Sequence, residues 1–154
     1  MPNQPLISGS VDIAAPPSIV WSLISDLRRM PDWSPQCRKM IVLGKDVKVG
    51  TRTLNVNRRG RLYWPTNAKI VAFDPQRRLA FRIVENRTVW PYELEPTETG
   101  TRLTEMRTAP AGVSKVSNVL TKNVFGGTDS FEVELGSGIH ETLERVKRAA
   151  EASV

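Results

Sequence analysis

The stretch VDIAAPPSIVWSLISDLRRMPDWSPQCRKM, residues 11–40, decides the fold of this 154-residue chain. It contains the end of an alternating segment, Leu6 to Ala14, which predicts a first strand. Pro16 disfavours helix at the residue before it, and Pro17 suits a first helical position, where its missing N–H would have no partner. The stretch therefore predicts a strand, a helix that begins at Pro17, a second short helix, and a strand that starts near Gln36.

Both predicted helices are short, and the first is amphipathic. Its apolar residues recur at the spacing of a buried face: Val20, Leu23, Ile24 and Leu27. Asp26 is expected to cap the second helix, which Pro31 or Pro35 must end. Two small helices are therefore expected between the first two strands.

Alternating residues and turn residues fill the middle of the chain. Further strands are predicted at residues 38–43, 51–57, 61–73, 79–85, 88–95 and 101–108. Turn-forming residues separate them, among them Gly50, Gly60 and the pair Asp74 and Pro75. Because the links are short, an antiparallel meander is expected, and seven strands in all would make a strongly bent sheet.

The last third of the chain changes to a helical period. Apolar residues recur there at intervals of three, four or their multiples: Leu120, Val124, Phe131, Leu135, Ile139, Leu143 and Val146. This predicts one long amphipathic helix from about Val119 to Ala150. The pair Gly126-Gly127 and the segment Gly136-Ser137-Gly138 interrupt the pattern, and close approach by a ligand or by the sheet would explain these glycines.

The totals indicate one globular domain over residues 1–154. Hydrophobic residues make up 40% of the chain and charged residues 25%. No apolar run approaches the roughly 20 residues that cross a bilayer, and the N-terminus lacks a basic region followed by an apolar one, so no secretion signal is expected. Cys37 is the only cysteine, which excludes an internal disulfide and favours a reducing, cytoplasmic location.

The net charge is +6, with a pI near 9.9. The basic residues come in small groups beside turns, as in NRRG at 57–60 and DPQRR at 74–78. A solvated rim explains them most simply. Aromatic residues of the kind that stack on bases are missing from these groups, so a nucleic acid partner is not expected. Peripheral contact with an anionic membrane stays open.

Several segments together resemble a known superfamily. They are VDIAAPPSIVWSLISDL and PDWSP near the start, VAFDPQRRLAFRI in the middle, GTRLTEM at 100–106, and IHETLERVKRAAE at the end. They are similar to the helix-grip (SRPBCC) superfamily of START lipid-transfer domains, the birch-pollen allergen and bacterial polyketide cyclase/dehydrase-like proteins. The resemblance implies an α+β helix-grip fold, in which a curved seven-stranded antiparallel sheet wraps around the long C-terminal helix. It also implies a cavity between sheet and helix that holds an apolar small molecule, with Trp21 and Trp33 as packing residues at the closed end.

Alternation on three strands defines a candidate chamber. Leu103, Glu105 and Arg107 share one face of the last strand, so both charges face the core if Leu103 does. Trp90, Tyr92 and Leu94 share a face of the strand before it, and Phe81, Ile83 and Glu85 a face of the strand before that. With residues of the final helix, the candidate ligand-binding set is Phe81, Ile83, Trp90, Tyr92, Leu94, Leu103, Glu105, Arg107, Val124, Phe131 and Leu135. A solid core is the alternative interpretation.

Catalytic candidates are few. Glu105, Arg107 and His140 are weak candidates for catalytic groups, and His140 is the only histidine. No nucleophile motif of a hydrolase is present, no metal-ligand spacing occurs, and neither a metal nor another cofactor is expected. His140 also fits a surface or helix-end role.

Two functions follow as expectations. The first is a carrier or sequestering protein for a lipid, polyketide-like or aromatic molecule. The alternative is a cyclase, aromatase or dehydratase acting on a polyketide-type substrate, with Glu105, Arg107, Tyr92 or His140 moving protons. The sequence decides neither between carrier and enzyme nor on the ligand or the oligomeric state.

Overall fold

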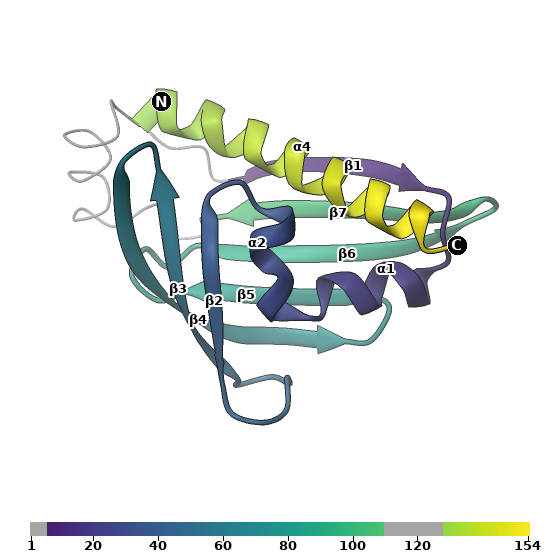
Figure 1. Cartoon of the computed structure of the whole chain (residues 1–154), viewed down its shortest axis with the longest axis horizontal. Coiled ribbons are helices and arrows are strands. Elements are labelled where there is room, and N and C mark those ends of the chain that lie inside the picture. Colours follow the sequence, from purple (N-terminus) through teal and green to yellow (C-terminus); the bar gives the residue numbers. More distant parts are fainter. Residues whose placement is uncertain (1–5, 110–127) are drawn as a thin grey trace.

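The computed structural model describes residues 6–109 and 128–154, with side chains over 7–109 and 136–154. The strands are β1 Leu6–Ile13, β2 Cys37–Leu43, β3 Arg52–Arg59, β4 Leu62–Asp74, β5 Arg78–Ile83, β6 Val89–Thr97 and β7 Gly100–Thr108. The helices are α1 Pro17–Ile24, the 3₁₀ turn η1 Leu27–Arg29, α2 Met30–Trp33 and α4 Thr128–Ala152. Figure 1 shows α1, α2 and α4 over the same face of one bent sheet.

The sheet is antiparallel throughout and has the strand order β1-β7-β6-β5-β4-β3-β2. Strands β2 to β7 are joined in sequence as neighbours, which confirms the predicted meander. The chain reaches β2 from β1 through the two small helices, so that β1 and β2 form opposite edges of the sheet. The predicted α+β helix-grip architecture is confirmed.

The entry into α1 follows the proline rules. Pro16 is extended, with φ −68° and ψ 157°, and α1 starts at Pro17 and buries Val20, Leu23 and Ile24. The expected cap by Asp26 is wrong, because its side chain makes no capping hydrogen bond to η1. Pro31 lies in the first turn of α2 instead of ending a helix, and Ser34, before Pro35, is already extended.

Helix α4 packs against β1 at a glycine. A Cβ added to Gly9 would lie 3.2 Å from Ile139 Cγ2 and 3.3 Å from a Leu143 methyl carbon, so the absence of a side chain lets helix and strand approach closely. Ile139, Leu143, Val146 and Ala150 are buried along the inner side of α4. This stripe closes the core between helix and sheet.

The glycines at 136 and 138 do not interrupt α4, which runs through both. An added Cβ would meet Ile7 at 3.7 Å from Gly136 and Pro35 at 3.6 Å from Gly138, so their nearest neighbours belong to the sheet and to the loop after α2. The part of the predicted helix at 119–127, with Gly126 and Gly127, lies outside the described residues.

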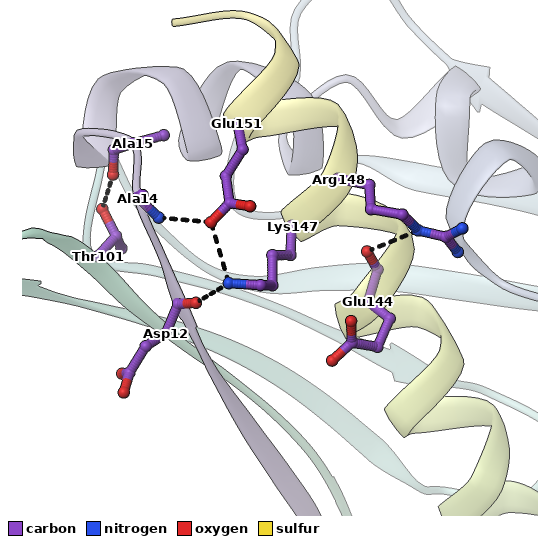
Figure 2. A network of polar contacts seen from close by, with 8 residues as sticks. All are labelled: Asp12, Ala14, Ala15, Thr101, Glu144, Lys147, Arg148 and Glu151. Atoms are coloured by element: carbon purple, nitrogen blue, oxygen red, sulfur yellow. Dashed lines mark hydrogen bonds and ion pairs between the residues drawn. The ribbon is translucent and has the colours of Figure 1, made fainter.

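Polar contacts hold the C-terminal end of α4 to the end of β1 (Figure 2). The Glu151 carboxylate accepts the backbone N–H of Ala14 and a hydrogen bond from Lys147 Nζ, both at 2.9 Å. Lys147 Nζ also donates to the carbonyl of Asp12 at 2.7 Å. Because a lysine and a glutamate one helical turn apart both reach β1, the helix end is fixed where the strand leaves the sheet.

Candidate functional site

Two ionisable side chains of β7 lie inside the fold. Leu103, Glu105 and Arg107 alternate on the side of the strand that faces the core, and Leu103 is fully buried. Glu105 and Arg107 are each only 4% exposed. Burying a carboxyl group costs free energy unless it is neutral, paired or hydrogen-bonded, so Glu105 identifies the region where the interior departs from simple packing.

Glu105 lies between a tyrosine and a glycine on the neighbouring strands. The register pairs it with Tyr92 of β6 on one side and with Gly9 of β1 on the other. The Tyr92 hydroxyl shares a hydrogen bond with the carboxyl group, while Glu105 Oε1 has no partner within the described part of the chain. One carboxyl oxygen is thus left to interact with something other than these protein groups.

A second buried polar atom lacks a partner among the described residues. It is Nε1 of Trp33, at the end of α2, whose side chain is 4% exposed. Arg29 covers this indole from outside, with its guanidinium carbon 4.8 Å from the ring centre. An indole N–H can only donate, so Trp33 offers the interior a hydrogen bond to an oxygen or nitrogen acceptor.

Burial keeps three titratable groups of this region, Glu105, Tyr92 and Cys37, mostly neutral near neutral pH. It raises the pKa of Glu105 to about 8, and the hydrogen bond from Tyr92 only partly opposes that rise. Near neutral pH the carboxyl group is therefore mostly protonated and able to donate a hydrogen bond. Burial, and then the nearby Glu105, raise the pKa of Tyr92 well above its ordinary value, and burial raises that of Cys37 to about 11.

The groups around this pair are apolar and aromatic. The Tyr92 hydroxyl lies 3.8 Å from Sδ of Met30, the first residue of α2, so this helix contacts the tyrosine that is hydrogen-bonded to Glu105. The Phe81 ring lies next to two aromatic rings of β6, with its centre 6.5 Å from that of Trp90 and 6.3 Å from that of Tyr92. A few polar atoms in an apolar surround are the usual composition of a small-molecule site.

The other candidate ligand-binding residues fall into two groups. Phe81, Ile83, Tyr92, Leu94, Leu103, Glu105 and Arg107 are buried on the helix-facing side of the sheet, and Trp90 is half-buried. The register that pairs Val89 with Thr108 places Arg107 opposite Trp90. Val124, and the side chains of Phe131 and Leu135, lie outside the described residues. That this set binds a ligand stays a prediction.

Two side chains lie away from the cluster. His140 is exposed on α4, so the structure does not bring it to Glu105. Glu85 was expected on the inner face with Phe81 and Ile83, and this is wrong. Strand β5 ends at Ile83, and the exposed Glu85 carboxylate accepts hydrogen bonds from the backbone and side-chain amides of Asn67. Within the described ranges no group of three or more His, Cys, Asp or Glu residues could hold a metal ion.

Two polar features of the interior were not predicted from the sequence: the unpartnered N–H of Trp33, which was expected only to pack, and a polar strip on β3. Thr53 and Asn55 are buried there, and Thr53 Oγ1 donates to Asn55 Oδ1 at 2.9 Å. The amides of Asn55 and Asn57 both reach Thr66 Oγ1 of β4, at 3.3 and 3.0 Å. The alternation of TRTLNVN, residues 51–57, was the available signal, because it puts every threonine and asparagine on one face.

A separate hollow lies on the surface. It has a volume of about 530 Å³ and is lined in part by Pro17, Pro75, Arg77 and Pro96, where the turn between β4 and β5 meets the start of α1. Neither of the unpartnered buried polar atoms belongs to its lining. The interior cluster around Glu105 is therefore the better candidate site.

A family model described as polyketide cyclase/dehydrase and lipid transport matches residues 4–151. The chain belongs to this family. That membership agrees with the resemblance seen in the sequence. No curated protein matches the chain in sequence.

Solved structures share the family fold. The polyketide cyclase-like protein Cgl2372 of Corynebacterium glutamicum is 27% identical, with 99% of this chain and 95% of that chain covered and a TM-score of 0.66. The Zhui aromatase/cyclase of Streptomyces sp. R1128 is 16% identical, with 95% and 93% covered and a TM-score of 0.76. The di-domain aromatase/cyclase StfQ of the steffimycin pathway is 12% identical, with 97% and 52% covered and a TM-score of 0.76. The likeness to the two aromatase/cyclases, which are 16% and 12% identical to this chain, shows the fold alone. No helix in the described ranges could span a bilayer.

Proposed function

We propose that this protein binds a hydrophobic small molecule between the sheet and α4, as a carrier or sequestering protein. The ligand carries a carbonyl or similar oxygen acceptor that meets Glu105 and Trp33. The observation that carries the proposal is the pair of buried polar atoms, Glu105 Oε1 and Trp33 Nε1, that have no partner among the described residues. Native proteins rarely leave such atoms unsatisfied.

The chemistry of the ligand follows from the state of these groups. A neutral Glu105 carboxyl group and an indole N–H are both hydrogen-bond donors near neutral pH. The aromatic residues Phe81, Trp90 and Tyr92 surround the region with apolar surface. A flat or aliphatic molecule with one acceptor oxygen fits this pattern, whereas a carboxylate ligand would oppose ionisation of Glu105 and bind poorly at high pH.

Two probes of almost the same shape test the proposal. 2-Acetylnaphthalene carries a carbonyl where 2-ethylnaphthalene carries a methylene group. In a fluorescence or calorimetric titration the wild-type protein is expected to prefer the acetyl compound by roughly fivefold to tenfold, the value of one hydrogen bond. Trp33→Phe removes the N–H and replaces the indole by a smaller aromatic ring, so it is expected to reduce that preference while still binding both probes.

A second, half-buried tryptophan supplies the matched control. Trp64→Phe on β4 also removes an indole N–H. Trp64 is half-buried, and its Nε1 is not among the unpartnered buried atoms, so this variant is expected to keep the preference for the acetyl compound. Failure of the wild-type protein to bind either probe would contradict the proposal. Equal binding of both probes, unchanged by Trp33→Phe, would contradict the assignment of the polar group.

A second function is supported by one specific observation. A carboxylic acid with a pKa of about 8, next to a tyrosine hydroxyl, is suited to transfer protons near neutral pH. The family description, and the two aromatase/cyclases that share the fold, name reactions that need such transfers. The alternative is therefore a cyclase, aromatase or dehydratase that acts on a carbonyl compound.

Deuterium exchange separates the enzyme from the carrier. An acid–base pair at the carbonyl of bound 2-acetylnaphthalene would speed enolisation, so its methyl hydrogens would exchange in heavy water about tenfold faster than in solution without protein. Glu105→Gln is expected to abolish the acceleration while retaining probe binding. Probe binding without accelerated exchange would support the carrier function and contradict the enzyme function.

A further inference from the structure

The face of the sheet that carries no described helix bears a row of cations across three neighbouring strands. The register pairs Arg52 of β3 with Lys69 of β4, and Lys69 with Arg82 of β5. All three side chains are exposed, and none makes an ion pair with a described residue. Like charges directly opposite one another destabilise a sheet, so this row opposes folding unless an anion meets it.

Exposed aliphatic side chains border this row. Leu43 of β2 continues it at the sheet edge, opposite Arg52, and is 52% exposed. On one side lie Ile41 and Leu54, which are cross-strand partners, together with Val84. On the other side lies Val71, two residues beyond Lys69. The water-facing side of an antiparallel sheet is normally polar, so this mixture of cations and aliphatic groups needs an explanation.

The loop 44–50 between β2 and β3 extends the same surface. It adds Lys45, Lys48 and Val49, whose side chain is 59% exposed. A backbone hydrogen bond of 2.8 Å from Gly50 to Ile70 holds the end of this loop beside β4. The nearby acids are Asp46 and Glu85, and Glu85 is already bound by Asn67, so cations outnumber acids five to two on this surface.

We propose that the outer face of β2–β5, with loop 44–50, docks on an anionic lipid bilayer. Interleaved basic and aliphatic side chains are the composition that binds anionic headgroups and the adjacent acyl boundary together. A nucleic acid would need aromatic residues among the cations for stacking, and an acidic protein would leave the aliphatic groups unexplained. This proposal is independent of the interior site, because its residues lie on the opposite face of the sheet.

Vesicle binding tests the surface. Co-sedimentation of the full chain is measured with vesicles of phosphatidylcholine alone and of phosphatidylcholine mixed with phosphatidylserine. Binding is expected only to the mixed vesicles and is expected to weaken as salt is raised. The triple variant R52Q/K69Q/R82Q is expected to bind on the order of 100-fold more weakly, since each surface cation contributes roughly a factor of 5.

A matched variant separates this surface from net charge. R28Q/R77Q/R148Q removes the same charge from exposed positions outside the surface and is expected to bind the mixed vesicles nearly as the wild type does. The double variant L43S/L54S keeps every cation and is expected to weaken binding about tenfold through lost aliphatic insertion. Circular dichroism and urea unfolding confirm that each variant is folded.

Three results would overturn the proposal. One is the absence of binding to phosphatidylserine vesicles by the wild-type chain. Another is equal weakening by the two triple variants, which would indicate unspecific attraction of a basic protein. The third is binding to heparin that depends on Arg52, Lys69 and Arg82 without vesicle binding, which would assign the surface to an anionic polymer. Loss of interior probe binding would bear on the carrier function alone.

Discussion

Glu105→Gln is expected to stabilise the protein against unfolding by about 4 kcal/mol more at about pH 9 than at about pH 5. In the wild type, burial raises the folded-state pKa of Glu105 from 4.5 to about 8. Between these values the folded protein holds a proton that the unfolded chain has lost. The wild-type free energy of unfolding therefore falls by about 1.4 kcal/mol per pH unit over that range and levels off above it.

Glutamine keeps the shape of the neutral carboxyl group and cannot ionise, so the free energy of unfolding of the variant does not fall in this way as the pH rises. Urea unfolding of both proteins across the pH range measures the difference. Glu98→Gln, on the exposed turn between β6 and β7, is the matched control and is expected to follow the wild type at every pH. Parallel curves for Glu105→Gln and wild type would show that Glu105 does not stay neutral in the folded protein.

Gly100→Ala is expected to destabilise the protein by about 4 kcal/mol or more. Gly100 starts β7 with φ +156°, and an added Cβ would lie 2.1 Å from the Ile13 carbonyl oxygen and 2.8 Å from the Ala15 nitrogen. Both neighbours are backbone atoms, so the end of β1 would have to move. That movement would also disturb the buried hydrogen bond of 2.8 Å from Thr101 Oγ1 to the carbonyl of Ala15, drawn in Figure 2.

The control for this substitution is Gly44→Ala, in the turn after β2. Gly44 has φ +117° and no heavy atom within 4 Å of an added Cβ. Gly44→Ala therefore has the energetic cost of an unfavourable backbone conformation but no steric overlap with neighbouring atoms. That cost is about 1 kcal/mol. Equal losses for the two variants, measured by thermal or urea unfolding, would contradict the account of close packing between β1 and β7.

The fold could be predicted from the sequence because local rules fixed most elements. Pro16 and Pro17 set the exit from β1 and the start of α1, and alternation located both ends of all seven strands to within two residues. The predictions were wrong where a side chain makes contacts that the alternation of polar and apolar residues does not encode. Alternation predicted that Glu85 faces the interior. Strand β5 ends before Glu85, and the exposed Glu85 carboxylate accepts hydrogen bonds from both amides of Asn67.

The site was only partly predictable. Alternation with Leu103 put Glu105 and Arg107 on the inner face, because an antiparallel strand of known register has only two faces. The unpartnered indole N–H of Trp33 depends on what surrounds α2 in space, and no periodicity encodes that. The inward polar face of β3 runs against hydropathy, since Leu54 lies outside while Thr53 and Asn55 are buried.

Titration of the Glu105 carboxyl group by ¹³C nuclear magnetic resonance tests the central claim most directly. The protein is labelled at glutamate side-chain carboxyl carbons, the resonance is assigned by its loss in Glu105→Gln, and the titration is repeated with 2-acetylnaphthalene. We expect a midpoint near the folded-state pKa of about 8, moving upward with the probe because an acceptor ligand binds the neutral acid. A midpoint close to the ordinary 4.5 that the probe leaves unchanged would contradict the account.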